Sequence, residues 1–191
     1  MKEIEIKLRI SDRAAVLRRI AELGWRARGE RELERNFVYD RPDGELRAAG
    51  CLLRVRDWAG VCLLTLKLPA AGAGLHKVKE EFEVEASDSA ALGKILEGLG
   101  YRLAWRYEKY RTYFELKNAP GVIVLDETPI GEFLELEGEP AWIDRTALEL
   151  GFSSQVYITD TYGALFEEHR ARNAGVGADM VFSGSVGPSS G

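Results

Sequence analysis

The chain opens with MKEIEIKL (residues 1–8), in which charged and aliphatic residues alternate. Side chains of a β-strand point alternately to its two faces, so Glu3, Glu5 and Lys7 share one face. The aliphatic residues between them point to the opposite face. This stretch therefore predicts a strand with one ionic face and one apolar face that packs against other elements.

The same alternation recurs in most of the later segments with strand character. Polar side chains occupy alternate positions at Arg54 and Arg56, Thr65 and Lys67, Lys77 through Glu85, Lys109 and Arg111, Asp126, and Glu135 and Glu137. A single strand of this kind commonly turns its charges toward water. Repetition in so many strands instead indicates a sheet curled around a polar interior, with helices covering its apolar outer face.

Composition favours a single globular domain. The 191 residues are 46% hydrophobic and 30% charged, which is enough apolar material for a real core. A net charge of -5 argues against a nucleic-acid partner. Cys51 and Cys62 are interpreted as free thiols in a reducing compartment. No run is apolar enough for a membrane span and no signal peptide precedes the first strand, so we expect a cytoplasmic protein.

Turn and capping residues divide the chain into two β-α-β-β halves. A strand at 2–10 leads through Ser11 and Asp12 into a helix that ends before Gly24, and a second helix begins at Ser87 and Asp88. The remaining strands are expected at 31–40, 51–58, 61–68, 75–86, 101–116, 121–127 and 132–138. Pro140 starts a third helix, and Thr159 or Asp160 caps a fourth. We expect residues 1–172 to form the domain and 173–191, rich in Gly and Ser, to be a disordered tail.

The ionic faces carry both signs of charge, and this mixture indicates the ligand. Basic donors are available from Lys7, Arg54, Arg56, Lys67, Lys109 and Arg111, with Lys77 or Lys79 as additions. Glu3, Glu5, Asp126, Glu135 and Glu137 would repel an anion unless a divalent metal lay between them. All-oxygen ligation suits Mg²⁺ or Mn²⁺, whereas two histidines make a zinc site of the usual kind a poor fit. A metal beside a cationic clamp suits a triphosphate.

These motifs resemble the CYTH superfamily, the triphosphate tunnel metalloenzymes that include class IV adenylyl cyclases and thiamine triphosphatases. Glu3-x-Glu5-x-Lys7 resembles the ExExK signature of that family. Later motifs follow in the same order over residues 1–168: Leu53-Arg54-Val55-Arg56, Thr65-x-Lys67, Glu81-x-Glu83, Lys109-x-Arg111, Leu125-Asp126 and 131–137 (GEFLELE). One ExExK is a weak signal, but six motifs in order are a strong one.

The resemblance implies an α+β fold, an eight-stranded antiparallel β-barrel that forms a triphosphate tunnel with helices packed outside. By the same resemblance the metal ligands would be Glu3, Glu5, Glu81, Glu83, Asp126, Glu135 and Glu137. The triphosphate would be held by Lys7, Arg54, Arg56, Lys67, Lys79, Lys109 and Arg111. Many cyclase-like members carry Arg-x-Glu-x-Glu in the middle strand. Here Lys79 stands in place of that arginine, which keeps the charge and loses bidentate geometry.

Two chemistries fit such a tunnel. We favour a metal-dependent triphosphatase acting on inorganic triphosphate, thiamine triphosphate or ATP. The alternative is a class IV adenylyl cyclase that converts ATP to cyclic AMP and pyrophosphate. By resemblance to hydrolytic members, Lys67 and Tyr39 would activate water, although Tyr39 could instead pack at a strand end.

A third hypothesis is a non-catalytic polyphosphate- or nucleotide-binding module, and the intact acidic set argues against it. Apolar area on the C-terminal helices makes a homodimer a candidate assembly.

Overall fold

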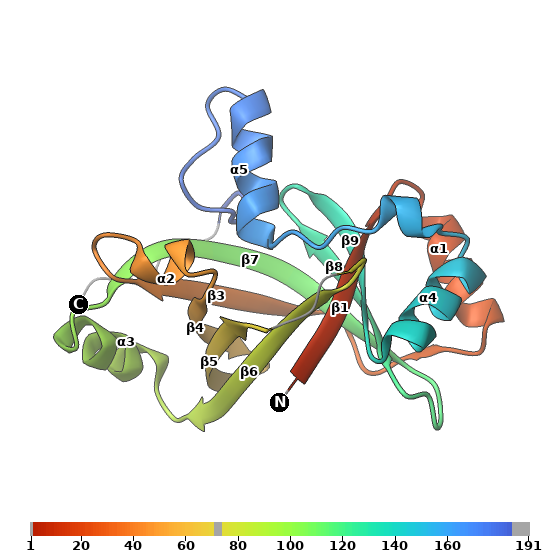
Figure 1. Ribbon diagram of the computed structural model, residues 1–191, viewed down its shortest axis with the longest axis horizontal. Helices are drawn as coiled ribbons and strands as arrows, with labels where there is room; N and C mark the ends of the chain where they lie inside the picture. Colours follow the sequence, from red (N-terminus) through yellow and green to blue (C-terminus); the bar gives the residue numbers. More distant parts are fainter. Residues whose placement is uncertain (1, 71–73, 185–191) are drawn as a thin grey trace.

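The computed structural model describes residues 2–70 and 74–184. Within them one antiparallel sheet runs in the order β2-β7-β3-β4-β5-β6-β1-β9-β8, and β7 also pairs with β8, which closes a barrel (Figure 1). The barrel strands are β1 (Lys2–Ile10), β3 (Glu32–Asp40), β4 (Leu52–Trp58), β5 (Val61–Pro69), β6 (Lys77–Ala86), β7 (Arg102–Glu115), β8 (Val122–Thr128) and β9 (Gly131–Glu137). The short β2 (Arg26–Ala27) extends the sheet beside β7. The expected eight-stranded barrel with outer helices is confirmed.

Strand register aligns the ionic residues inside the barrel. Lys7 of β1 lies opposite Glu135 of β9, and Arg111 of β7 lies opposite Asp126 of β8. Cross-strand partners share a face, so the alternation within each strand becomes a continuous ionic lining. The intervening aliphatic residues point outward, where they need a cover.

Two helices cover the outer face of β1, β8 and β9. They are α1 (Arg13–Glu22) and α4 (Pro140–Glu149), which lie together on one side of the barrel (Figure 1). Ile6 and Leu8 of β1 are fully buried in the cluster beneath them. Burial of each such aliphatic side chain contributes about 1.5–3 kcal/mol. A Cβ added at Gly121 would lie 2.4 Å from the Trp142 ring, so glycine there permits α4 to approach the sheet.

The expected helix boundaries agree with the capping side chains at α1 and α3. The Asp12 carboxylate accepts the Ala15 N–H at 2.9 Å at the start of α1. Asp88 accepts two backbone N–H groups at the start of α3 (Ser89–Gly98), which covers β4. A short α2 (Glu45–Ala48) lies in the connection between β3 and β4. These caps satisfy N–H groups that the helix itself cannot pair.

A last helix, α5 (Tyr162–Arg172), stands apart from α1 and α4 (Figure 1). Thr161 caps it by accepting the Ala164 N–H at 3.2 Å, so the expectation of Thr159 or Asp160 was wrong by one or two residues. Phe166 packs with Phe133 of β9 in a separate apolar cluster. This packing fixes the first turn of α5 beside the barrel interior. A short 3-10 helix, η1 (Ser154–Val156), lies in the connection between α4 and α5.

Part of the tail expected to be disordered is ordered. Met180 is fully buried, its backbone N–H donates to the Arg106 carbonyl at 3.0 Å, and its carbonyl accepts the Glu108 N–H at 2.8 Å. Asp179 accepts a bond from the Arg106 guanidinium at 2.8 Å. The expectation overlooked that one apolar residue and one carboxylate are enough to attach a Gly- and Ser-rich segment to an outer strand. Residues 185–191 lie outside the described part.

Cys51 and Cys62 are both free thiols. Across the described ranges, none of the helices combines the length and the apolar character that crossing a membrane requires.

Candidate active site

The barrel interior contains a cavity of about 1070 Å³. Most of the charged residues singled out in the sequence line it. They come from six strands of the barrel and are Glu3, Glu5, Lys7, Arg54, Arg56, Lys67, Lys79, Glu81, Glu83, Lys109, Arg111, Glu135 and Glu137. Burial away from bulk water strengthens every ionic contact between them. The contacts divide this lining into a basic side and an acidic side.

Two arginines of β4 form the first part of the basic side. Arg56 donates to the Glu83 carboxylate at 2.8 Å, and Thr65 donates to the same oxygen at 2.7 Å. Arg54 donates to the Tyr107 hydroxyl at 3.0 Å. Both guanidinium groups are buried, and both are oriented by neutral or acidic partners on other strands. Their planar donors are therefore held in place before any ligand arrives.

Lys109 and Arg111 of β7 form the second part, and Asp126 holds both. The Lys109 ammonium lies 2.9 Å from Asp126, and Arg111 donates to the two Asp126 oxygens at 2.7 and 2.6 Å. The Tyr162 hydroxyl, at the first turn of α5, donates to Asp126 at 2.8 Å. Although burial opposes the charged form, Asp126 and Glu135 keep the pKa of Arg111 well above its ordinary value. Asp126 thus serves here to hold basic groups, and its role as a metal ligand stays a prediction.

Glu135 lies between the basic groups of β1 and β7. It contacts Arg111 closely and lies 3.4 Å from the Lys7 ammonium. Burial would raise its pKa, but the charges of Arg111, Lys109 and Lys7 overcome this and lower the pKa to about 2. Glu135 is therefore ionised at any physiological pH.

The acidic side consists of Glu3, Glu5 and Glu137 with two lysines between them. The Lys67 ammonium lies 2.5 and 2.6 Å from the Glu3 oxygens, and the Lys77 ammonium lies 2.5 Å from Glu5. Burial opposes ionisation of Glu5, yet nearby ammonium groups hold its pKa well below the ordinary range. The pKa of Glu3 is raised, chiefly by burial and by the charge of Glu5.

Crowding among these carboxylates provides a test of whether a divalent metal fits. Desolvation, then the charges of Glu3 and Glu5, raise the pKa of Glu137 to about 7. A hard divalent cation would relieve this repulsion, and carboxylate oxygens are the ligands that Mg²⁺ and Mn²⁺ prefer. Among the described residues, no three acidic side chains lie close enough together to hold a metal ion in this structure. The donor chemistry fits, provided that the lysines move aside.

Residues of β6 lie along one edge of the cavity. Lys79 is half-buried and donates to the carbonyl of the exposed Gly50 at 2.8 Å. Glu81 lies 3.3 Å from the Lys67 ammonium, while Glu83 binds Arg56. Each of these side chains thus has a protein partner in this structure, and their predicted roles toward metal and triphosphate stay predictions.

The structure does not bring Tyr39 next to Lys67. Tyr39 belongs to the outward-facing row of β3 and packs with Leu53 and Leu96 under α3. Its hydroxyl lies so near Gly93 that an added Cβ there would be 2.6 Å away. Both residues nevertheless border the cavity, and their role as a catalytic pair stays a prediction. Tyr39 lies opposite Leu53 in the regular register between β3 and β4, and this pairing cannot be recognised in the sequence.

Sequence reasoning missed three interior residues, of which Glu34 and Asn36 lie on β3. Both are almost completely buried, and Glu34 lies opposite Lys109. Their spacing by two gave a signal, but a strand with charges on both faces obscured it. Tyr162 was missed because only the packing of α5 brings it to Asp126.

The fold and the lining together define a closed antiparallel barrel whose interior combines a basic clamp with crowded carboxylates. The CYTH domain model matches residues 1–150, so the chain belongs to the CYTH family. It is similar to a protein of Methanocaldococcus jannaschii provisionally named an adenylate cyclase, with 28% identity over 137 residues, which cover 72% of this chain and 77% of the relative.

Solved structures share the fold at lower identity. A provisionally named adenylate cyclase of Vibrio parahaemolyticus has a TM-score of 0.76 at 21% identity, with coverage of 86% of this chain and 97% of the other. A Pyrococcus horikoshii protein has a TM-score of 0.72 at 23% identity and 88% and 99% coverage. A Hippeastrum protein, named provisionally as an adenylyl cyclase and described as having dominant triphosphatase activity, has a TM-score of 0.63 at 21% identity and 87% and 96% coverage.

Proposed function

We propose that this protein is a Mg²⁺- or Mn²⁺-dependent triphosphatase that hydrolyses inorganic or organic triphosphates inside the barrel. The observation that carries the proposal is the pairing of a preoriented basic clamp with crowded carboxylates in one cavity. A triphosphate has both the negative charge that the clamp needs and the oxygens that a metal bound by carboxylates would contact.

The basic residues account for substrate binding. Arg54 and Arg56 would take phosphate oxygens through their planar donors, with Lys109 and Arg111 on the adjacent β7 side. Lys7 would act from β1. These cations would stabilise negative charge on the departing diphosphate group because they are oriented beforehand and shielded from water. Lys79, at the exposed edge, would meet the substrate as it enters.

The acidic residues account for metal binding. Glu3, Glu5 and Glu137 would hold the ion, with Glu81, Glu83, Asp126 and Glu135 as the further candidates. When bound, the ion supplies Lewis-acid charge neutralisation at the phosphate oxygens. Lys67 lies between Glu3 and Glu81, at the border of the two sides. We propose that it orients the attacking water and contacts the terminal phosphate.

Adenylyl cyclase activity is the second candidate, because the M. jannaschii relative carries that name. Hydrolysis is favoured because of the aromatic residues near Arg54. Trp105 stacks on Tyr107 at 4.7 Å between ring centroids and also packs against Phe166 of α5. Its ring faces are thus engaged within the protein, whereas an adenine would need an open aromatic face. The activity described for the Hippeastrum neighbour agrees with this choice.

Product analysis tests the proposal. The purified protein is incubated with inorganic triphosphate, thiamine triphosphate or ATP, with Mg²⁺, Mn²⁺ or EDTA, alongside Glu5→Gln. We expect orthophosphate that requires metal and is absent with Glu5→Gln. Cyclic AMP with pyrophosphate would establish the cyclase instead. Tight binding of all three compounds with no product would leave a polyphosphate- or nucleotide-binding module.

A further inference from the structure

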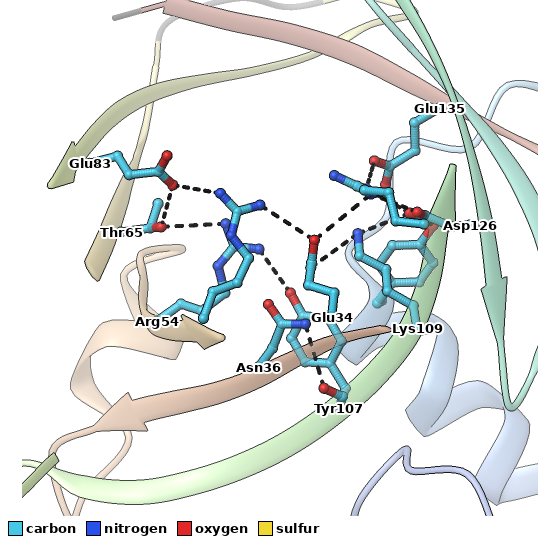
Figure 2. A network of polar contacts seen from close by, with 12 residues as sticks. Glu34, Asn36, Arg54, Thr65, Glu83, Tyr107, Lys109, Asp126 and Glu135 are labelled. Atoms are coloured by element: carbon cyan, nitrogen blue, oxygen red, sulfur yellow. Dashed lines mark hydrogen bonds and ion pairs between the residues drawn. The ribbon is translucent and has the colours of Figure 1, made fainter. Parts of the chain in front are cut away.

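A buried carboxylate sits in the middle of the basic clamp. Glu34 on β3 is 0% exposed and lies 3.5 Å from an Arg56 nitrogen, 3.6 Å from the Lys109 ammonium and 3.9 Å from Arg111. Figure 2 shows Glu34 between Arg54 and Glu83 on one side and Lys109 and Asp126 on the other. The carboxylate thus lies at the junction between the β4 part and the β7 part of the clamp.

The contacts of Glu34 are longer than the other contacts of the same cations. Arg56 has its short contact with Glu83 at 2.8 Å, and Lys109 has its short contact with Asp126 at 2.9 Å. Glu34 is therefore a shared second partner of three cations, each of which has a closer carboxylate partner elsewhere. Because its contacts are long, a phosphate group could attract these cations without first breaking a strong bond to Glu34.

Several polar atoms around Glu34 have no hydrogen-bond partner among the described residues. They are Oε1 of Glu34, Oδ1 of Asn36 and the Nε atoms of Arg54 and Arg56, all buried. Buried polar atoms in folded proteins are nearly always paired, by protein or by water. Their concentration at one point indicates that this part of the cavity is completed by solvent or by a ligand.

Glu34 is not suited to proton transfer or to metal binding. Burial opposes its ionisation, but the charges of Lys109, Arg111, Arg56 and Arg54 hold its pKa far below the ordinary value. A carboxylate that stays ionised at every working pH is a poor general base. Its neighbours are cations, so an incoming metal ion would be repelled there. The remaining effect of the carboxylate on a polyanion is electrostatic.

We propose that Glu34 is a positioning residue that spaces the clamp cations and limits the affinity of the barrel for polyphosphate. The inference rests on the proposed function, because it takes the clamp as the triphosphate site. One buried negative charge offsets the mutual repulsion of Arg56, Lys109 and Arg111 and holds these cations around it in the empty barrel. The same charge repels the bound anion, which would otherwise be held too tightly for the diphosphate product to leave.

The test compares anion affinity in Glu34→Gln with the original protein. Isothermal titration calorimetry with inorganic triphosphate and with diphosphate, in EDTA, measures binding without turnover. Two unit charges about 8 Å apart at an effective dielectric constant of about 20 correspond to a change of roughly tenfold to thirtyfold. We therefore expect Glu34→Gln to bind both anions at least tenfold more tightly, whereas a residue needed only for structure would weaken binding when replaced.

Two variants serve as controls. Glu34→Asp keeps the charge and should return the affinity to within about threefold of the original. Glu108→Gln removes a buried carboxylate from the outward face of β7, where it contacts Arg35 and the Phe182 N–H, and should leave the affinity unchanged. Unchanged or weaker anion binding by Glu34→Gln would overturn the proposal, as would equal tightening by Glu108→Gln.

Turnover separates this inference from the proposed function. With metal present, Glu34→Gln should lower both KM and kcat, because product release slows. If the original protein binds triphosphate but yields no product, the proposed triphosphatase activity is refuted. The affinity comparison between the original protein and Glu34→Gln still tests the role of Glu34 in that case. If Glu34→Gln is unfolded without ligand, triphosphate should restore its folding, and failure to do so would overturn the inference.

Discussion

Asp126→Asn should destabilise the metal-free protein severely. Asp126 is fully buried and accepts bonds from Lys109, from Arg111 and from Tyr162. Asparagine has nearly the same shape, but its amide cannot compensate two buried cations. Removing one partner of a buried ion pair costs about 3–5 kcal/mol. For a domain of this size, each kcal/mol changes Tm by about 2–4 °C, so we expect a loss of roughly 6–20 °C.

The assay is thermal and urea unfolding in EDTA, followed by circular dichroism. Glu167→Gln is the control, because it removes only an exposed pair with Arg170 and should cost less than about 0.5 kcal/mol. If Asp126 were chiefly a metal ligand held among like charges, its neutralisation would leave the metal-free protein equally stable or more stable. A loss below about 1 kcal/mol in Asp126→Asn would therefore refute the reasoning that Asp126 holds the clamp.

Three further expectations address the acidic side, the clamp and the outer face. The pKa of Glu137 is about 7 in the folded protein and 4.5 for an unperturbed glutamate, as in the unfolded chain. Between these values the folded state binds more protons than the unfolded state, so the contribution of Glu137 to stability should fall as pH rises from 4.5 toward 7. Glu137→Gln should flatten that part of the metal-free Tm profile; a profile parallel to the original would contradict the crowding argument. Arg56→Ala should weaken triphosphate binding at least about tenfold by calorimetry, since a buried charged donor is lost; unchanged affinity would mean that the clamp lies elsewhere. Tyr39→Phe should keep kcat within about twofold, because the hydroxyl faces α3; a tenfold decrease would contradict its outward placement.

The barrel and its ionic lining could be predicted because an extended chain alternates its side chains with a period of two. In β1, Glu3, Glu5 and Lys7 share a face whatever the rest of the chain does. The capping residues at Asp12 and Asp88 were equally local signals, since each satisfies N–H groups within three residues. Such features depend on neighbours along the chain, and they were recovered with correct boundaries.

The tertiary structure determines which charged side chains contact one another. Lys77 and Lys79 share a strand face, yet Lys77 binds Glu5 inside while Lys79 turns to the exposed Gly50 carbonyl. Pairing with Leu53 of β4 and packing under α3 direct Tyr39 outward.

The centre of the clamp likewise could not be read from the sequence. Glu34 meets its cations across three strands, and Tyr162 reaches Asp126 from a helix 36 residues further along the chain. Alternation is a property of each strand alone, whereas register, closure of the barrel and helix docking depend on interactions between distant segments.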